Sequence, residues 1–312
     1  HFGSPLSLSL VKKLSARVIV NSRAVYEKFR RSISSAKLRV VYQAVETPEE
    51  RGGVGGNDGA FRLVLVGRKA PGKGQEDAVR AMAVLLKKGL NVRLRIVGAE
   101  DPQYGLFLRR LARELGVEER IDFAPFTARP MREIASCHVA LTCSRNEAFG
   151  RVTVEGMKLG KPVVGANSGG TAELIRDGWN GLLYRAGDAD DLARKIEMLY
   201  ENRVLVSQMG ANARTWSRGM FTLENYASSL MKVFEEVLGS GGRSGNRAMG
   251  GRAARNPERL VGEWYGRLWR VVVCQGAGVD AGARPYPRPM WPRWWNSQAG
   301  CSRRLDENPK VC

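Results

Sequence analysis

The sequence predicts an α/β fold built around a doubly wound parallel sheet. The chain has 312 residues and a hydrophobic fraction of 43%, which is enough for one large core or two ordinary ones. From Phe61 onward, short apolar runs alternate with helical patterns. Strands that alternate with helices run parallel and are joined by right-handed crossovers, so that helices cover both faces of the sheet.

Residues 1–50 are predicted to be the end of a preceding domain. A helical pattern at 11–14 is followed by a short buried strand at 17–22, a charged helix at 24–31 and a strand at 38–42. Residues 51–60 include the run Arg-Gly-Gly-Val-Gly-Gly-Asn-Asp-Gly. This composition is typical of a flexible linker.

Residues 61–238 make up the predicted sheet domain. Strands are expected at 61–66, 92–97, 121–123, 139–142, 162–166 and 181–184. Helices are expected at 72–88, 104–115, 131–136, 151–159, 171–176, 189–200, 204–216 and 223–238. This order of elements is typical of a Rossmann-like domain, in which ligands bind outside the carboxyl ends of the strands.

Residues 239–312 break this rhythm and are predicted to be a basic, irregular tail without fixed structure. Five of the seven tryptophans and six of the thirteen prolines lie here, and no long helical stripe is present. The stretch from Arg284 to Trp295 is compatible with binding to RNA or to a membrane surface. An extension with no role is the alternative and is favoured.

The net charge of +19 allows nucleic acid, an anionic membrane surface or polyanionic substrates as partners. Thirteen basic and five acidic residues follow residue 240, and the remaining excess is spread over the chain. Diffuse charge of this kind favours solubility or contact with anionic surfaces. Nucleic acid is therefore not expected as a partner.

Cysteine usage indicates a reducing compartment. The five cysteines form no C-x2-C pair, and Cys137 and Cys143 lie in or beside an apolar strand, where buried free thiols are expected. No secretory signal or run of 18 apolar residues is visible. We therefore expect a cytoplasmic protein. With two histidines, and no acidic D-x-D motif, no metal site is expected.

Two of the predicted strand-to-helix loops are rich in glycine. The run Gly67-Arg68-Lys69-Ala70-Pro71-Gly72-Lys73-Gly74 combines close backbone approach with cations that suit a diphosphate. It matches neither a Walker loop nor a G-x-G-x-x-G fingerprint, so ATP hydrolysis and NAD binding are not supported. The run Asn167-Ser168-Gly169-Gly170-Thr171-Ala172-Glu173 opens another helix. In isolation, a cationic turn explains the first run equally well. A capped helix start, with Thr171 near the cap, is expected for the second run whatever the function.

The third loop carries the most informative feature, two glutamates spaced by seven residues. Glu147 precedes a Phe-Gly break, and Glu155 lies about one turn inside the helix that follows. A helix start offers free N–H groups and a positive dipole end, which suit a phosphate, and flanking acids suit sugar hydroxyls. The alternative is an amphipathic helix with two exposed acids. Because all three loops follow parallel strands, they are expected along one edge of the sheet.

Residues 61–238 resemble the carboxyl-terminal domain of the retaining glycosyltransferases of family 4, also called glycosyl transferases group 1, which have the GT-B fold. The resemblance rests on spaced motifs in the family's order: Gly67-Arg68 with Lys73-Gly74, Ile96-Val97-Gly98, Ser144-Arg145-Asn146-Glu147-Ala148-Phe149-Gly150, Val154-Glu155-Gly156-Met157, Gly160-Lys161-Pro162-Val163-Val164, Gly169-Gly170 with Glu173, and Asp177-Gly178 with Gly181-Leu182-Leu183. Residues 18–50 resemble the last strands of the family's amino-terminal domain.

The resemblance implies a UDP- or GDP-sugar as donor and co-substrate, with retention of configuration and without a cofactor or metal. It implies catalytic roles for Arg68 and Lys73 at the diphosphate and for Glu147 at the sugar. Glu155 would hold the ribose hydroxyls. A last group of donor-binding residues comprises Phe149, Gly150, Arg151 and Val152, the last three through backbone N–H groups that face the sugar and phosphate.

Two departures from the family pattern bear on activity. Gly156 stands where the family usually has Ala, and only the last fragment of an amino-terminal, acceptor-side domain is recognisable. The acceptor is therefore not identified, although the positive charge favours an anionic or lipid-linked one and peripheral contact with a membrane. The alternative function is a non-catalytic module that binds a nucleotide sugar or a partner.

Overall fold

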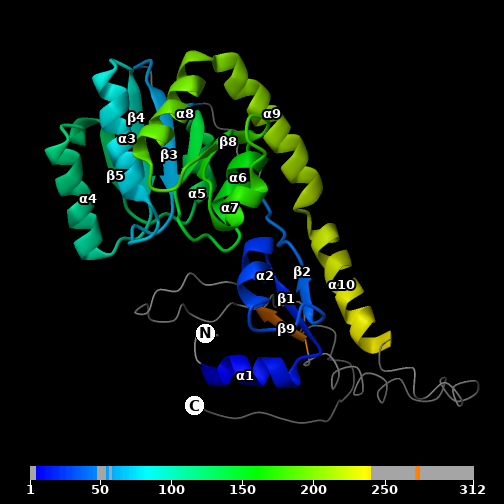
Figure 1. The fold of residues 1–312 in the computed structure, drawn as a ribbon. Helices are drawn as coiled ribbons and strands as arrows, with labels where there is room; N and C mark the ends of the chain where they lie inside the picture. Colours follow the sequence, from blue (N-terminus) through cyan, green and yellow to red (C-terminus); the bar gives the residue numbers. More distant parts are fainter. Residues whose placement is uncertain (1–4, 48–53, 56–57, 240–270, 275–312) are drawn as a thin grey trace, which may run out of the picture. The chain divides into compact units, whose positions relative to one another are not determined.

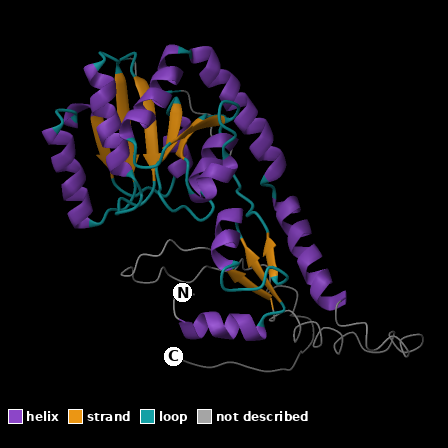
Figure 2. Ribbon diagram, viewed as in Figure 1, coloured by secondary structure: helices purple, strands orange, loops and turns teal. Residues whose placement is uncertain are grey.

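The computed structural model describes residues 5–47, 54–55, 58–239 and 271–274 (Figures 1 and 2). Its main element is a six-stranded sheet in the order β5-β4-β3-β6-β7-β8, with every pair parallel. The strands are β3 (Phe61–Val66), β4 (Val92–Val97), β5 (Ile121–Ala124), β6 (Val139–Thr142), β7 (Val163–Ala166) and β8 (Gly181–Tyr184). All six agree with the predicted strands to within a residue at either end.

Helices cover both faces of this sheet. One face is covered by α3 (Gln75–Lys87), α4 (Pro102–Glu114) and α8 (Ala189–Glu201), through a core that includes Leu63, Met82 and Leu108. The other face meets α5 (Pro130–Ala135), α6 (Arg151–Lys158) and α9 (Arg203–Met220), around Val64, Met157 and Ala213. A short 3-10 helix, Glu118–Arg120, precedes β5, and α7 (Gly169–Leu174) follows β7. The predicted doubly wound fold is confirmed.

The helix boundaries differ from the predicted ones for local reasons. The helix expected from residue 72 begins at Gln75, because Gly72 and Gly74 have the left-handed φ values of +82° and +71°. The helix α4 begins earlier than expected, since Asp101 accepts a hydrogen bond from the Tyr104 N–H and caps it.

A second, smaller sheet combines two strands near the start of the chain with one strand from residues 271–274. Its order is β2-β1-β9, with β1 (Arg17–Val20) between β2 (Leu38–Val40) and β9 (Val271–Cys274), all parallel. The helices α1 (Pro5–Leu14) and α2 (Arg23–Phe29) accompany it, and Val233 of α10 (Leu223–Gly239) packs with Ile19 and Val41. The strand β9 is not predicted by the sequence pattern. The rest of the tail, and the expectations for it, lie outside the described residues.

The strand order of the main sheet fixes where a ligand can bind. Strands β3 and β6 are neighbours, with Leu63 opposite Val139, and the chain continues from them toward opposite edges of the sheet. A crevice opens at such a switch point, outside the carboxyl ends of the strands. None of the described helices is both long and apolar enough to cross a membrane.

Candidate functional site

The loops that follow β3, β6 and β7 meet at the carboxyl edge of the sheet, as predicted. A Cβ added to Gly74 would lie 2.1 Å from the Cys143 carbonyl oxygen, so the first two loops touch through their backbones. The Arg145 N–H donates to the Gly72 carbonyl over 3.0 Å. The Gly170 N–H donates to the Glu147 carbonyl over 2.7 Å, which brings the third loop against the second. Gly74, Gly169 and Gly170 are therefore needed for close approach of the three loops.

An ion pair joins the first loop to the second. Lys73 Nζ lies 3.1 Å from Glu147 Oε2, and both side chains remain partly exposed, at 39% and 27%. The Arg68 side chain is exposed and has no hydrogen bond or ion pair within the described part of the chain. A diphosphate placed here would meet one unpaired cation and a second whose partner is displaceable.

Glu155 lies inside the first turns of α6 and is 5% exposed. Its Oε1 lies 3.2 Å from Arg151 Nε, one helical turn earlier. Burial raises the pKa of Glu155, and the nearby Arg151 guanidinium partly opposes that shift. Because Arg151 pairs with Oε1, the Oε2 atom of this carboxylate can accept hydrogen bonds from a ligand's hydroxyl groups.

The start of α6 offers backbone donors. Gly150 is the N-cap, with φ +90° and no capping side chain. The backbone N–H groups of Gly150, Arg151 and Val152 donate no hydrogen bond within the described residues. An oxyanion is a suitable acceptor for such groups, because the helix dipole adds to the attraction.

Phe149 is placed differently from a ligand-contacting side chain. It is 3% exposed and packs among Val45, Val154, Leu174 and Phe221. Its ring also lies 6.2 Å, centre to centre, from that of Tyr42. The side chain therefore anchors the loop, and only the Phe149 backbone is left for a ligand.

The helix that follows the third loop, α7, begins earlier than expected, because its N-cap is not near Thr171. The N-cap of α7 is Ser168, and its hydroxyl donates to the Arg145 carbonyl. Thr171 is fully buried, and its hydroxyl has no partner within the described residues. Glu173 Oε2 accepts from the Arg23 N–H over 2.9 Å and from the Tyr42 hydroxyl over 3.2 Å.

Two residues that hold the loops of this edge together, Lys69 and Asp77, are not identified by the sequence pattern. Lys69, between the two candidate cations, is 1% exposed, and its Nζ donates to the carbonyls of Gly98 and Ala124 over 2.7 Å each. It fastens the loops after β4 and β5 instead of facing a ligand. Asp77 is 2% exposed and pairs with Arg145. A sequence motif does not show that Lys69 is buried and Lys73 is partly exposed, because both lysines lie in the same glycine-rich loop.

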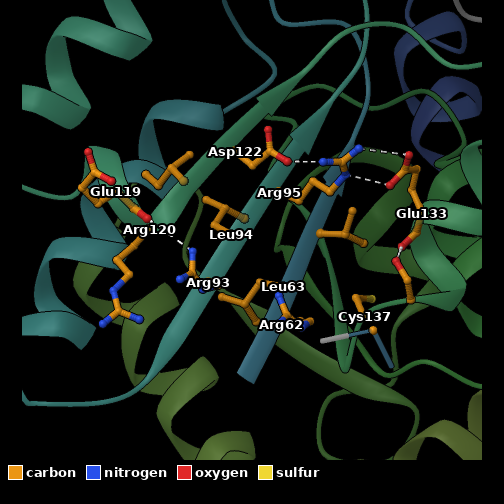
Figure 3. A pocket seen from close by; sticks show the side chains of 14 residues that line it. Arg62, Leu63, Arg93, Leu94, Arg95, Glu119, Arg120, Asp122, Glu133 and Cys137 are labelled. Atoms are coloured by element: carbon orange, nitrogen blue, oxygen red, sulfur yellow. Dashed lines mark hydrogen bonds and ion pairs between the residues drawn. The ribbon is translucent and has the colours of Figure 1, made fainter. Parts of the chain in front are cut away.

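A separate pocket of about 440 Å³ lies against β3, β4, β5 and α5 (Figure 3). Three of its four arginines are already ion-paired, since Arg95 binds both Asp122 and Glu133, and Arg62 and Arg93 bind Asp58. The fourth, Arg120, donates a hydrogen bond to the Asn91 side chain. Arg62 and Arg93 are the second residues of their strands, so this pocket is away from the carboxyl edge. It is an ion-paired surface hollow and not part of the candidate site.

The predicted buried thiols are confirmed, because Cys137 and Cys143 are free and buried. Burial raises the pKa of each to about 12, so neither is reactive at neutral pH. Among the described residues, no group of three or more His, Cys, Asp or Glu side chains is arranged to hold a metal ion.

Comparison with known proteins gives one family. Residues 46–216 match the family model described as glycosyl transferases group 1. A D-inositol 3-phosphate glycosyltransferase of Nocardia farcinica is 32% identical over 218 residues, which cover 66% of this chain and 47% of that protein. An uncharacterised glycosyltransferase of Methanocaldococcus jannaschii is 38% identical over 109 residues, or 34% of this chain and 31% of the relative. This chain thus spans about half the length, or less, of these relatives.

Solved structures are similar in fold. Anabaena HepE, crystallised with UDP and glucose, has a TM-score of 0.67 and 26% identity, covering 74% of this chain and 66% of that one. A crystal structure of the same protein with UDP-glucose has a TM-score of 0.65. Sucrose-phosphate synthase of Thermosynechococcus elongatus has a TM-score of 0.63 at 23% identity, covering 76% of this chain and 63% of that one. The predicted GT-B relationship is confirmed.

Proposed function

This chain belongs to the glycosyl transferases group 1, and from that premise we propose that it binds a UDP- or GDP-sugar and transfers the sugar to an acceptor with retention of configuration. The donor class is supported by Anabaena HepE, a structural neighbour that was crystallised with UDP and with UDP-glucose. The single observation that carries the proposal is the Lys73–Glu147 ion pair at the switch point, beside the uncapped start of α6.

The cations serve the leaving group in this proposal. When the bond from the sugar C1 to the β-phosphate oxygen breaks, the electron pair stays on the diphosphate, whose negative charge grows. Arg68 and Lys73 and the free N–H groups at the start of α6 stabilise that charge, which lowers the barrier. Because these groups already supply positive charge, no metal ion is proposed.

Glu147 serves the sugar. As the diphosphate engages Lys73, the Glu147 carboxylate is left beside the position where the sugar becomes cationic. The acceptor oxygen then attacks C1 on the face that the diphosphate leaves, and its proton passes to the departing phosphate oxygen. This sequence gives retention of configuration.

Glu155 serves the nucleoside. Its buried carboxylate lies four residues inside the helix whose start meets the phosphates, a position suited to the ribose hydroxyls. Hydrogen bonds from the ribose hydroxyls to this carboxylate would be charge-assisted and shielded from water, because the carboxylate is buried. The base itself, uracil or guanine, is the part of the donor that these residues do not discriminate.

The acceptor and location are further parts of the proposal. The net charge of +19 favours an anionic or lipid-linked acceptor and contact with the surface of an anionic membrane, on the cytoplasmic side. Vesicle binding that does not change with anionic lipid content would contradict this part.

A second candidate function is a non-catalytic module that binds a nucleotide sugar or a partner. It is favoured by the described loops at the carboxyl edge, whose ion pair and uncapped helix start suit a nucleotide sugar. Such a module needs only these donor-side groups, whereas a transferase also needs an acceptor site.

Two measurements separate these functions. Calorimetry with UDP-glucose, GDP-mannose, UDP and GDP tests donor binding, and binding of none of them would rule out both the transferase and a module that binds nucleotide sugars. Release of labelled sugar from a bound donor then tests catalysis. Turnover supports the transferase, and binding without turnover supports the module.

A further inference from the structure

Arg145 contacts the segments that follow β3 and β7, on either side of its own loop at the carboxyl edge. Its guanidinium lies 3.0 Å from Glu76 Oε1 and 3.0 Å from Asp77 Oδ1, both in the first turn of α3. Its backbone N–H donates to the Gly72 carbonyl, and its carbonyl accepts from the Ser168 hydroxyl. One residue thus joins the segments after β3, β6 and β7.

Asp77 extends these connections to the end of β8. Its Oδ2 accepts from the Tyr184 hydroxyl over 3.2 Å and from the Gly187 N–H over 3.1 Å. With 2% of its surface exposed, Asp77 holds these groups in a site of low dielectric, where its hydrogen bonds are strong. The Arg145 guanidinium balances the negative charge of Asp77, and both of its carboxylate partners belong to α3.

Glu147 lies two residues after Arg145 and is held at both ends. Its carbonyl accepts from the Gly170 N–H over 2.7 Å, and its carboxylate meets Lys73 at 3.1 Å. Because both of these partners come from other loops, the place of Glu147 depends on how those loops are held together. Arg145, in the same loop, also touches both neighbouring segments, and its guanidinium binds two carboxylates of α3.

We propose that Arg145 is a positioning residue, which fixes Glu147 against the donor sugar by tying the loop 143–150 to α3 through its guanidinium. This role rests on the proposed function of the site. It differs from the roles of Arg68 and Lys73, because the Arg145 guanidinium is already bound by two carboxylates and serves no phosphate. Its effect therefore falls on the sugar end of the donor.

The test is a double-mutant cycle of Arg145→Gln and Glu147→Ala, read by calorimetry with UDP and UDP-glucose, and with GDP and GDP-mannose. The quantity compared is the dissociation constant for the nucleoside diphosphate divided by that for the corresponding nucleotide sugar. We expect each single variant to lower this ratio about fivefold, and the double variant to differ from either single variant by less than about twofold. Arg145→Lys keeps the charge and should recover part of the loss.

Two further measurements distinguish local loosening from a general loss of folding. Hydrogen exchange of the Gly170 amide should become about tenfold faster in Arg145→Gln, since its acceptor carbonyl belongs to Glu147, whereas the amides of β3 and β4 should keep their wild-type rates. The control Arg113→Gln removes an exposed arginine of α4 that pairs with Glu118 of the following 3-10 helix, and it should change neither the ratio nor the exchange rate.

The outcomes are distinct. Fully additive effects in the cycle, or an unchanged ratio in Arg145→Gln, would overturn the role of Arg145 and leave the donor site intact. A wild-type chain that binds none of the four probes would instead overturn the proposed function, and the role of Arg145 with it.

Discussion

Lys73 Nζ and Glu147 Oε2 lie 3.1 Å apart, although 74 residues separate them in the chain. The pair joins the two loops that flank the switch point of the sheet. Since both side chains are partly exposed, their mutual attraction contributes about 1 kcal/mol or less. A bound diphosphate can therefore take Lys73 from Glu147 at small cost, which leaves the carboxylate free for the sugar.

Replacement of Lys73 should weaken donor binding. In Lys73→Ala we expect the dissociation constant for UDP- or GDP-sugar to rise at least about tenfold, a loss of about 1.4 kcal/mol, because a charge-assisted contact to the phosphate is removed. Calorimetry at one salt concentration measures this. Lys88→Ala is the control, because Lys88 is also a half-exposed lysine paired with a glutamate, Glu197. Equal affinities in wild type and Lys73→Ala would contradict the assignment.

Replacement of Glu155 should separate stability from binding. Burial raises the pKa of this carboxyl group in the folded state, so the unfolded chain releases its proton at lower pH. The folded state then binds more protons, and stability falls as pH rises above the unfolded value of about 4.3. Glu155→Gln lacks this penalty and is expected to unfold at a higher temperature than wild type near pH 7, with a smaller gain near pH 4.5.

The same variant should bind the nucleoside diphosphate at least about tenfold more weakly, since a charged acceptor is lost. Glu114→Gln is a suitable control, because Glu114 forms an ion pair of the same helical spacing with Arg110 on an exposed surface. A stability gain at pH 7 with full nucleotide affinity would show that Glu155 is not a ligand-binding residue.

Replacement of Gly72 or Gly74 by alanine should lower the free energy of unfolding by different amounts. Both Gly72 and Gly74 have positive φ, but a Cβ at Gly72 meets open space, whereas one at Gly74 would lie 2.1 Å from a backbone oxygen. Gly72→Ala should cost about 1 kcal/mol of unfolding free energy from the backbone conformation alone. Gly74→Ala should cost about 3 kcal/mol or more, because the two loops must separate. Equal costs in denaturant titrations would contradict the close approach.

His138 should make stability depend on pH. Burial, reinforced by Arg203, lowers the pKa of His138 to about 4, and its Nδ1 accepts from the Arg62 N–H over 2.9 Å. The unfolded chain, with a histidine pKa near 6.5, binds more protons between about pH 4 and 6.5, so the free energy of unfolding rises with pH through that window. Allowing for partial exposure, we expect about 1–2 kcal/mol over the window.

The variant His138→Asn can keep an acceptor for the Arg62 N–H but does not titrate. Its free energy of unfolding should therefore vary less with pH than that of wild type by about the same amount. Parallel pH profiles for the two proteins, measured by denaturant titration, would show that His138 is not the group responsible.

Much of the fold follows from local pattern. The six strands of the main sheet and the helices between them are set by runs of apolar residues and by caps, which depend on neighbours in sequence. The strand β9 is an exception, because Val271–Cys274 pairs with Arg17–Val20 across most of the chain. No local signal in an irregular tail identifies such a partner.

The site divides in the same way. The sequence alone determined which loops carry glycines, cations and acids, and the order of strands and helices placed those loops at one edge of a parallel sheet. It could not decide that Lys69 is buried under the carbonyls of Gly98 and Ala124, nor that Arg145 binds Asp77. Both outcomes depend on the direction of side chains after packing. Burial, and with it charge pairing, is a property of the assembled loops, and only the tertiary structure decides it.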